Sequence, residues 1–425
     1  MEDFLSLDIL SVISAVARQL LGTVLFNFVF IILYILIIAF IKHKIDRQSE
    51  VRENATGAPG RTARAMIEEV ILVSFITGFI ASIAIVFIGI SLDISVIPYL
   101  FIIMILLSII NPRFACFSYA GGLMALASAV LGIPGFSPSS LIALIAIAHL
   151  AESVLVFMFG AKNTIPVYIK HGDGIAGAFI IQRFWPLPLI FVVSGIQSVA
   201  GGGMESLIKA GWWPVFRSVS TTAGIITLGL GCVAAFVSYS DIAVSRLPEK
   251  KAREKSLLDL CYAAVLMAIA FFARNSQAIS IVGALAAIIL HEGISIFSRL
   301  RDNRHKPLFK AEKRGLKVFE VPESSHAWDM GIKRGDIILS VNDRDIQTAE
   351  GLAGVLNDFP TYLWVRIITL KGVEKLLEYR FYPEGVNNLG IISVPRQLEV
   401  TYNVDNFENF SIIKNLVARF KGNIR

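Results

Sequence analysis

The sequence predicts a polytopic α-helical membrane bundle followed by a small C-terminal α+β domain. Of the 425 residues, 55% are hydrophobic and only 17% are charged, and the mean hydropathy is +0.67. Soluble domains carry about 25% charged residues, so this composition is typical of a protein in a lipid bilayer. The apolar windows end near residue 297, and alternating strand and helix patterns follow. Two domains of different class therefore share the chain.

About nine apolar windows are long enough to cross a membrane, which takes about 20 helical residues. We expect spans near 21–41, 70–90, 95–111, 114–133, 140–160, 186–201, 219–240, 258–273 and 277–297. The weakest are 186–201, which Pro186 and Pro188 shorten, and 258–273, which begins beside Asp259. Residues 1–19 have an apolar stripe with charged residues beside it and are interpreted as an interfacial segment. The transmembrane helical domain is then expected over 20–300.

Lysine and arginine indicate the side of the membrane, because short basic loops stay in the cytoplasm. Basic segments recur at 42–64, 162–183, 246–255 and 299–314. The loops between them carry little charge, which places the C-terminal domain in the cytoplasm. Because the net charge of +6 lies mostly beside the membrane, we expect anionic lipid as its counterpart and no nucleic acid.

Two shorter segments complete the organisation. Residues 164–184 show two strand patterns around His171-Gly-Asp-Gly174, which predicts a small cytoplasmic hairpin. Residues 399–425 are interpreted as a basic amphipathic tail. The cysteines fall within predicted spans and imply no disulfide framework: Cys116, Cys232 and Cys261.

Residues 305–398 contain the most specific pattern of the chain. A strand at 316–321 is followed by the turn Gly331 to Gly335, the strand-like run 336–342 and a helix that begins after the N-cap candidate Thr348. Two β-rich runs around Lys371-Gly372 predict a hairpin. This arrangement resembles a PDZ domain, a fold that binds peptides.

The resemblance implies a peptide groove formed by a strand edge, a helix wall and a nest of backbone N–H groups. In bacterial PDZ domains with permuted strand order, the nest has an apolar-Gly-apolar pattern, which Leu389-Gly390-Ile391 matches. Ile392 then begins the edge strand. The helix wall is assigned to three apolar residues: Leu352, Val355 and Leu356. The competing interpretation is that they simply pack the domain core, and for Leu356 the two interpretations are equally open. An internal peptide of a partner, in place of a free C-terminus, is an alternative ligand for this groove.

Two pairs of ionisable residues lie within predicted spans, where charge is expensive to bury. His149 and Glu152 are three residues apart on one helix face, and His291 and Glu292 are adjacent. A PDZ domain with such residues resembles the intramembrane zinc proteases. Their His-Glu-x-x-His motif fails here, because Ser295 stands where the second histidine is needed. We therefore expect no catalytic residue, no metal and no cofactor, and we interpret the pairs as polar contacts within the bundle.

A transporter is a further alternative, because buried acids and glycine-interrupted spans are compatible with one. The layout of many spans, Ala148-His-Leu-Ala-Glu152, Ile180-Ile-Gln-Arg-Phe-Trp-Pro-Leu-Pro188 and a C-terminal PDZ-like segment is more similar to the MinJ family of Gram-positive division-site proteins. This resemblance implies a non-enzymatic scaffold in the cell membrane, enriched at septa and poles, that bridges DivIVA-like proteins to MinC and MinD. It leaves homo-oligomer formation open.

Overall fold

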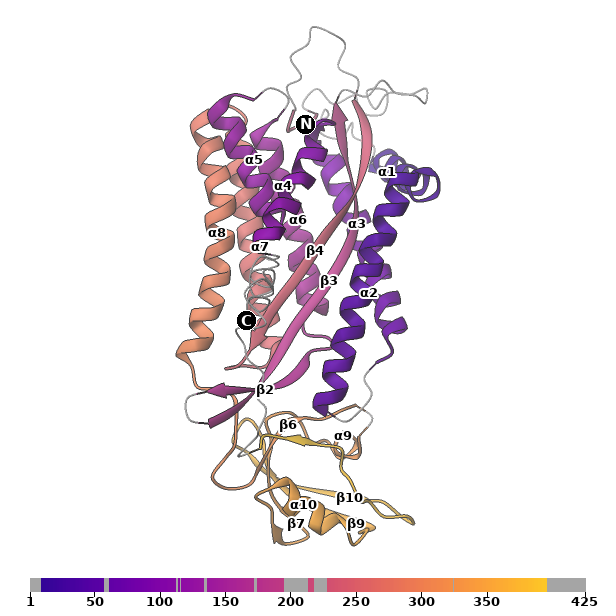
Figure 1. Cartoon of the computed structure of the whole chain (residues 1–425), viewed down its shortest axis with the longest axis vertical. Coiled ribbons are helices and arrows are strands. Elements are labelled where there is room, and N and C mark those ends of the chain that lie inside the picture. The colour runs from indigo at the N-terminus through magenta and orange to yellow at the C-terminus, as the bar shows by residue number, and fades with distance from the viewer. Residues whose placement is uncertain are drawn as a thin grey trace, which may run out of the picture.

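The computed structural model consists of an upright helical bundle with a smaller β-rich domain at one end (Figure 1). It describes residues 9–56, 61–111, 114, 116–133, 136–171, 174–194, 213–217, 228–323 and 325–395. The predicted tail at 399–425 lies outside these residues, as do the first eight of the interfacial segment. The helices of the bundle are α1 (Ile9–Phe26), α2 (Phe28–Thr56), α3 (Ala63–Ile88), α4 (Val96–Ile110), α5 (Phe117–Leu131), α6 (Pro138–Phe159), α7 (Pro248–Ala273) and α8 (Gln277–Arg304).

Six of the described helices are long and apolar enough to cross a membrane, namely α1, α2, α3, α6, α7 and α8. Helices α4 and α5 are apolar but shorter, with 15 residues each. Helix α1 continues to Phe26, past the expected start of the first span near residue 20. The break comes at Asn27, whose side-chain oxygen accepts the N–H of Phe30 and caps α2.

The expectation of nine helical spans is wrong, because windows 186–201 and 219–240 contribute strands where the structure describes them. Residues 186–194 belong to β3 (Gly174–Ser194) and residues 228–240 to β4 (Leu228–Ala243), and these two strands form one long antiparallel hairpin. A hydropathy window measures apolar content and cannot distinguish a buried strand from a helix. The alternating prolines are the physical reason against a helix, since each lacks an N–H and clashes with the preceding turn.

The prolines suit the edge of β3 that faces away from β4. Along this edge the hydroxyl of Tyr34 donates to the carbonyl of Pro186 at 3.0 Å, and the N–H of Ile190 donates to Oγ of Ser82 at 2.9 Å. Alternate residues of a strand direct their N–H groups to the same edge, and Pro186 and Pro188 alternate with Ile190 in this way. The N–H groups that these prolines lack would therefore have pointed to the same edge as that of Ile190. The strand therefore buries few unpaired donors in an apolar environment.

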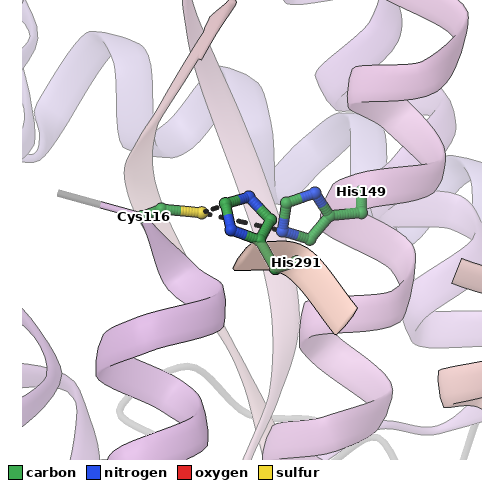
Figure 2. A group of neighbouring side chains, drawn as sticks. All are labelled: Cys116, His149 and His291. Atoms are coloured by element: carbon green, nitrogen blue, oxygen red, sulfur yellow. Dashed lines mark hydrogen bonds between the residues drawn. The ribbon is translucent and has the colours of Figure 1, made fainter. Parts of the chain in front are cut away.

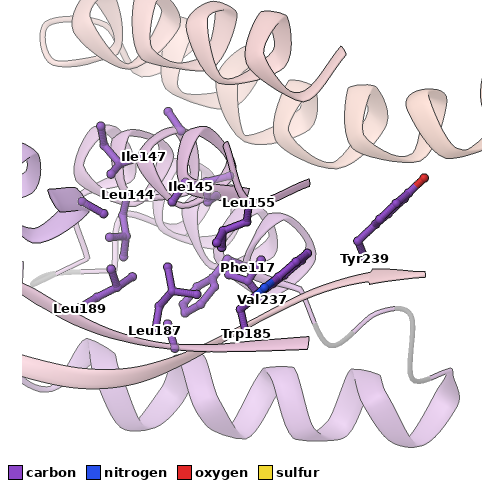
Figure 3. Packing of buried hydrophobic residues seen from close by; sticks show 14 of the residues in the cluster. Phe117, Leu144, Ile145, Ile147, Leu155, Trp185, Leu187, Leu189, Val237 and Tyr239 are labelled. Atoms are coloured by element: carbon purple, nitrogen blue, oxygen red, sulfur yellow. The ribbon is translucent and has the colours of Figure 1, made fainter. Parts of the chain in front are cut away.

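The central helix of the bundle is α6, which packs against the hairpin. Figure 3 shows Leu144 and Leu155 of α6 near Trp185 and Leu187 of β3, with Val237 of β4 beside them. All of these side chains are buried in one large hydrophobic cluster. This packing holds the middle of α6, which carries His149 and Glu152, away from the surface of the bundle.

Near the β-rich domain, β3 is flanked by two further short strands. β2 (Ile165–His171) pairs antiparallel with β3 over the predicted hairpin region, and β5 (Phe309–Lys310) pairs with β3 at Ala176 and Gly177. At the other end of the bundle, β1 (Ser91–Asp93) lies parallel to the last residues of β3. One strand of 21 residues thus extends from the far end of the bundle to the C-terminal domain.

The C-terminal domain is a twisted sheet with two short helices. Its elements are β6 (Leu316–Glu320), α9 (His326–Asp329), β7 (Ile337–Val341), β8 (Arg344–Asp345), α10 (Ala349–Leu356), β9 (Tyr362–Ile368), β10 (Glu374–Arg380) and β11 (Ile392–Ser393). The strand order is β10-β9-β7-β6-β11, and β8 pairs with β7. Helix α10 starts where the sequence predicts, because Oγ1 of Thr348 accepts the N–H of Gly351 at 3.1 Å.

Candidate functional site

The predicted nest segment lies beside the short helix α9. The carbonyl of Leu389 accepts the N–H of Ala327 at 2.9 Å, and Leu389 is buried in the core of the domain. Gly390 has a left-handed φ of 72°, and a Cβ on it would lie 2.7 Å from Cβ of Ser325. Its N–H donates to Oδ1 of Asn388 at 2.7 Å. The side-chain oxygen of Asn388 thus already accepts one backbone N–H of the predicted nest.

β11, which begins at Ile392, forms one edge of the sheet. Val394 donates its N–H to the backbone carbonyl of Lys317 in β6 at 3.2 Å, so the neighbouring Ser393 directs its N–H and C=O away from β6. The outward carbonyl of Ser393 accepts the hydroxyl of Tyr168 at 2.8 Å. Burial raises the pKa of Tyr168 to about 12, so this phenol stays protonated and donates at neutral pH.

The three apolar residues assigned to the helix wall are buried. Leu352, Val355 and Leu356 are 5%, 8% and 2% exposed and belong to the same hydrophobic cluster as Leu389. Ile391 is half-buried against this cluster. The structure therefore gives the three α10 residues a packing role in the domain core.

Strand β6 joins the C-terminal domain to the hairpin through its two faces. Val318 points into the domain core, whereas Phe319 belongs to the large cluster of the bundle. The Phe319 ring lies 4.8 Å from that of Phe179, 5.1 Å from Phe309 and 5.5 Å from Tyr168, measured between centroids. The domain is thus docked on β3 and β5 by an aromatic cluster.

The structure brings together the two intramembrane histidines that the sequence identified on separate spans. His149 in α6 and His291 in α8 have ring centroids 5.1 Å apart (Figure 2). Cys116, the N-cap residue of α5, contacts both rings, with Sγ 3.7 Å from Nε2 of each. Sequence reasoning treated Cys116 as an ordinary cysteine of a span, and no local motif around it pairs it with either histidine.

A polar network surrounds His149. Nδ1 lies 2.9 Å from Oε2 of Glu152. On the other side of the ring, Oγ of Ser118 lies 2.6 Å from Nε2 and 2.9 Å from the hydroxyl of Tyr262. Oε1 of Glu152 is 3.6 Å from Nζ of Lys255. Buried polar groups are thus linked across α5, α6 and α7.

Glu292 has a different environment from its neighbour His291. Its Oε2 accepts the hydroxyl of Tyr119 at 2.5 Å. Ser295, which stands where a zinc protease needs its second histidine, donates its hydroxyl to the backbone carbonyl of His291 at 3.5 Å. Among the described residues, the His-Glu-x-x-His geometry is therefore not reproduced on α8.

Comparison with known proteins identifies one relative in Bacillus subtilis (strain 168), the cell division topological determinant MinJ. The two sequences are 25% identical over 250 residues, which cover 58% of this chain and 59% of MinJ. The chain resembles MinJ. The match covers less than two thirds of the length of MinJ. No family model and no solved structure matches.

Proposed function

We propose that this chain is a membrane-embedded determinant of division-site position whose C-terminal domain is a PDZ-like docking module in the cytoplasm. The similarity to MinJ carries the proposal, since MinJ is described as a topological determinant of cell division. By the resemblance given above, its partners are DivIVA-like and MinD-like proteins, and anionic lipid supports it at the membrane surface. The role requires binding and no chemistry.

The distribution of basic residues supports a cytoplasmic C-terminal domain. Arg52 lies near the end of α2, Arg64 at the start of α3, Lys250 at the start of α7 and Arg301 at the end of α8. These ends of the four helices are on the side of the bundle that carries the C-terminal domain (Figure 1). Short basic segments at one end of a bundle favour retention on the cytoplasmic side. Anionic lipid then contributes on the order of 1 kcal/mol for each such side chain near the surface.

Peptide capture would use the outer edge of β11. An extended partner segment can add to this edge through the outward N–H and C=O of Ser393, and its carboxylate could replace Asn388 at the N–H of Gly390. The hydroxyl of Tyr168 already holds the outward carbonyl of Ser393. Binding therefore competes with two internal hydrogen bonds, each with a net contribution of about 1 kcal/mol.

The cellular role is tested by localising a fluorescent fusion of the full chain in dividing cells. We expect enrichment at septa and poles, together with mislocalised division when the gene is deleted. A uniform signal around the cell membrane with normal division-site placement would contradict the proposal.

The docking edge is tested separately with proline, which removes an N–H. Ser393→Pro should abolish capture of partners by the full chain in nanodiscs, because its N–H points away from β6. Leu376→Pro is the matched control on β10, at the opposite edge of the sheet. Because the N–H of Phe381 donates to the carbonyl of Thr361, odd-numbered residues of β10 direct their N–H groups to β9, and the N–H of Leu376 points outward. Tyr168→Phe should strengthen capture about fivefold, as expected for the loss of about 1 kcal/mol of competition. Equal capture by both proline variants would argue against this edge.

A further inference from the structure

Three metal-binding side chains converge in the middle of the bundle. Cys116 comes from the N-terminus of α5, His149 from the middle of α6 and His291 from the middle of α8 (Figure 2). One donor atom from each residue lies within 4.8 Å of the other two. Thiolate and imidazole together are the donors that zinc prefers in proteins. We propose that Cys116, His149 and His291 bind a zinc ion between these three helices.

The sulfur-to-nitrogen distances suit this assignment. With a Zn–S bond of about 2.3 Å and a Zn–N bond of about 2.0–2.1 Å, the S···N separation is about 3.6 Å for tetrahedral and about 3.8 Å for trigonal geometry. The observed separation is 3.7 Å from Sγ of Cys116 to Nε2 of both His149 and His291. A thiol carries one proton and can donate to one ring at a time, whereas a metal ion satisfies both contacts at once.

The surroundings of His149 prepare Nε2 as a ligand. The Glu152 carboxylate, 2.9 Å from Nδ1, favours the tautomer with its proton on Nδ1, which leaves the Nε2 lone pair toward Cys116. Ser118 contacts the same Nε2 at 2.6 Å, so its hydroxyl either rotates away when zinc binds or supplies the fourth ligand.

His291 points to the same position from α8. Its Nδ1 is buried and has no hydrogen-bond partner among the described atoms. Cys116 is therefore the polar neighbour of this ring at Nε2, 3.7 Å away. The Tyr119 and His291 rings are nearly perpendicular, with centroids 5.1 Å apart, and this packing orients the imidazole.

The charge of the network also favours a divalent cation. Lys255 contacts both Glu152 and Asp259, so the three groups together carry one negative charge. A zinc ion with the Cys116 thiolate carries one positive charge, which balances it. Buried charges need such compensation because water is excluded. The zinc ion would thereby connect α5, α6 and α8. We assign no bond-breaking step to the site, because the carboxylate of Glu292 is engaged by the hydroxyl of Tyr119.

The test is metal analysis of the full chain, purified in detergent with a reducing agent and dialysed against zinc-free buffer. Elemental mass spectrometry should find about one zinc per chain, as expected for a single site. Cys116→Ser and His291→Ala should each lose the ion, whereas Cys261→Ser, which changes an exposed cysteine of α7, should keep it. Copper or iron in place of zinc would overturn the choice of metal.

Two further measurements keep the proposal testable if a ligand variant does not fold. Cobalt loaded into the wild-type chain should give a thiolate-to-cobalt charge-transfer band in the near ultraviolet. Glu152→Gln should keep the site but weaken zinc binding about 10–100-fold, since Glu152 acts through His149. A folded wild-type chain without stoichiometric zinc and without the cobalt band would overturn the inference. This outcome leaves the division-site proposal intact, because that proposal does not depend on a metal.

Discussion

Replacing Phe319 by alanine should undock the C-terminal domain from the bundle without unfolding either part. The ring is fully buried and contacts Phe179, Phe309 and Tyr168 across the junction. A buried Phe→Ala change costs about 3–5 kcal/mol through lost transfer energy and the cavity left behind. Because the aromatic partners lie on β2, β3 and β5, most of this cost should fall on docking. A cost of about 3 kcal/mol corresponds to a shift on the order of a hundredfold in the docking equilibrium.

The matched control is its neighbour Val318→Ala. Val318 points into the core of the C-terminal domain, so this change should destabilise the domain itself, by about 1–3 kcal/mol. Hydrogen exchange measured on the full chain in nanodiscs distinguishes the two effects. Phe319→Ala should speed exchange at β5 and leave β7 and β9 protected, whereas Val318→Ala should do the reverse. The same exchange pattern in both variants would refute the assignment of the two faces of β6 to two cores.

Further predictions concern the edge of β3 inside the bundle. Gly78→Ala should destabilise the chain by about 1–3 kcal/mol, because the new Cβ would lie 2.6 Å from the carbonyl oxygen of Pro188. Gly293→Ala meets no atom within 4 Å and should be neutral or stabilising in the same thermal unfolding assay. Ser82→Ala removes the acceptor of the Ile190 N–H and should cost about 1–3 kcal/mol, the penalty for an unpaired buried donor. An unchanged melting temperature for Gly78→Ala and Ser82→Ala would mean that α3 does not seal this edge.

Helices and the C-terminal elements could be predicted from the sequence because their signals are local. An apolar window of helical length predicts α3 or α6, and Thr348 predicts the start of α10. The long hairpin could not be predicted in this way. Pro186 and Pro188 argue against a helix, but a strand in a bilayer needs a partner, and β4 comes from a part of the chain more than 30 residues away.

The candidate sites could be predicted only in part, for a similar reason. His149 and His291 stand out as ionisable residues in apolar helices, which is a signal that one sequence contains. Their proximity depends on how α6 and α8 pack, and the contribution of Cys116 depends on the position of a third helix. At the C-terminal domain, Gly390 was identified from a pattern, whereas Tyr168 lies more than 200 residues earlier and contacts Ser393 only in the folded chain.

The hairpin also gives a physical reason for so many membrane helices around a domain that one span could anchor. An unpaired strand edge cannot face lipid, because its N–H and C=O groups would lack partners. β3 pairs with β4 along one edge, and along the other it depends on side chains from α2 and α3, such as Tyr34 and Ser82. These helices must in turn be packed on their remaining faces. β3 crosses the bundle and pairs with β2 and β5 next to the C-terminal domain. A strand in this position requires several helices around it, because they keep its edge away from lipid.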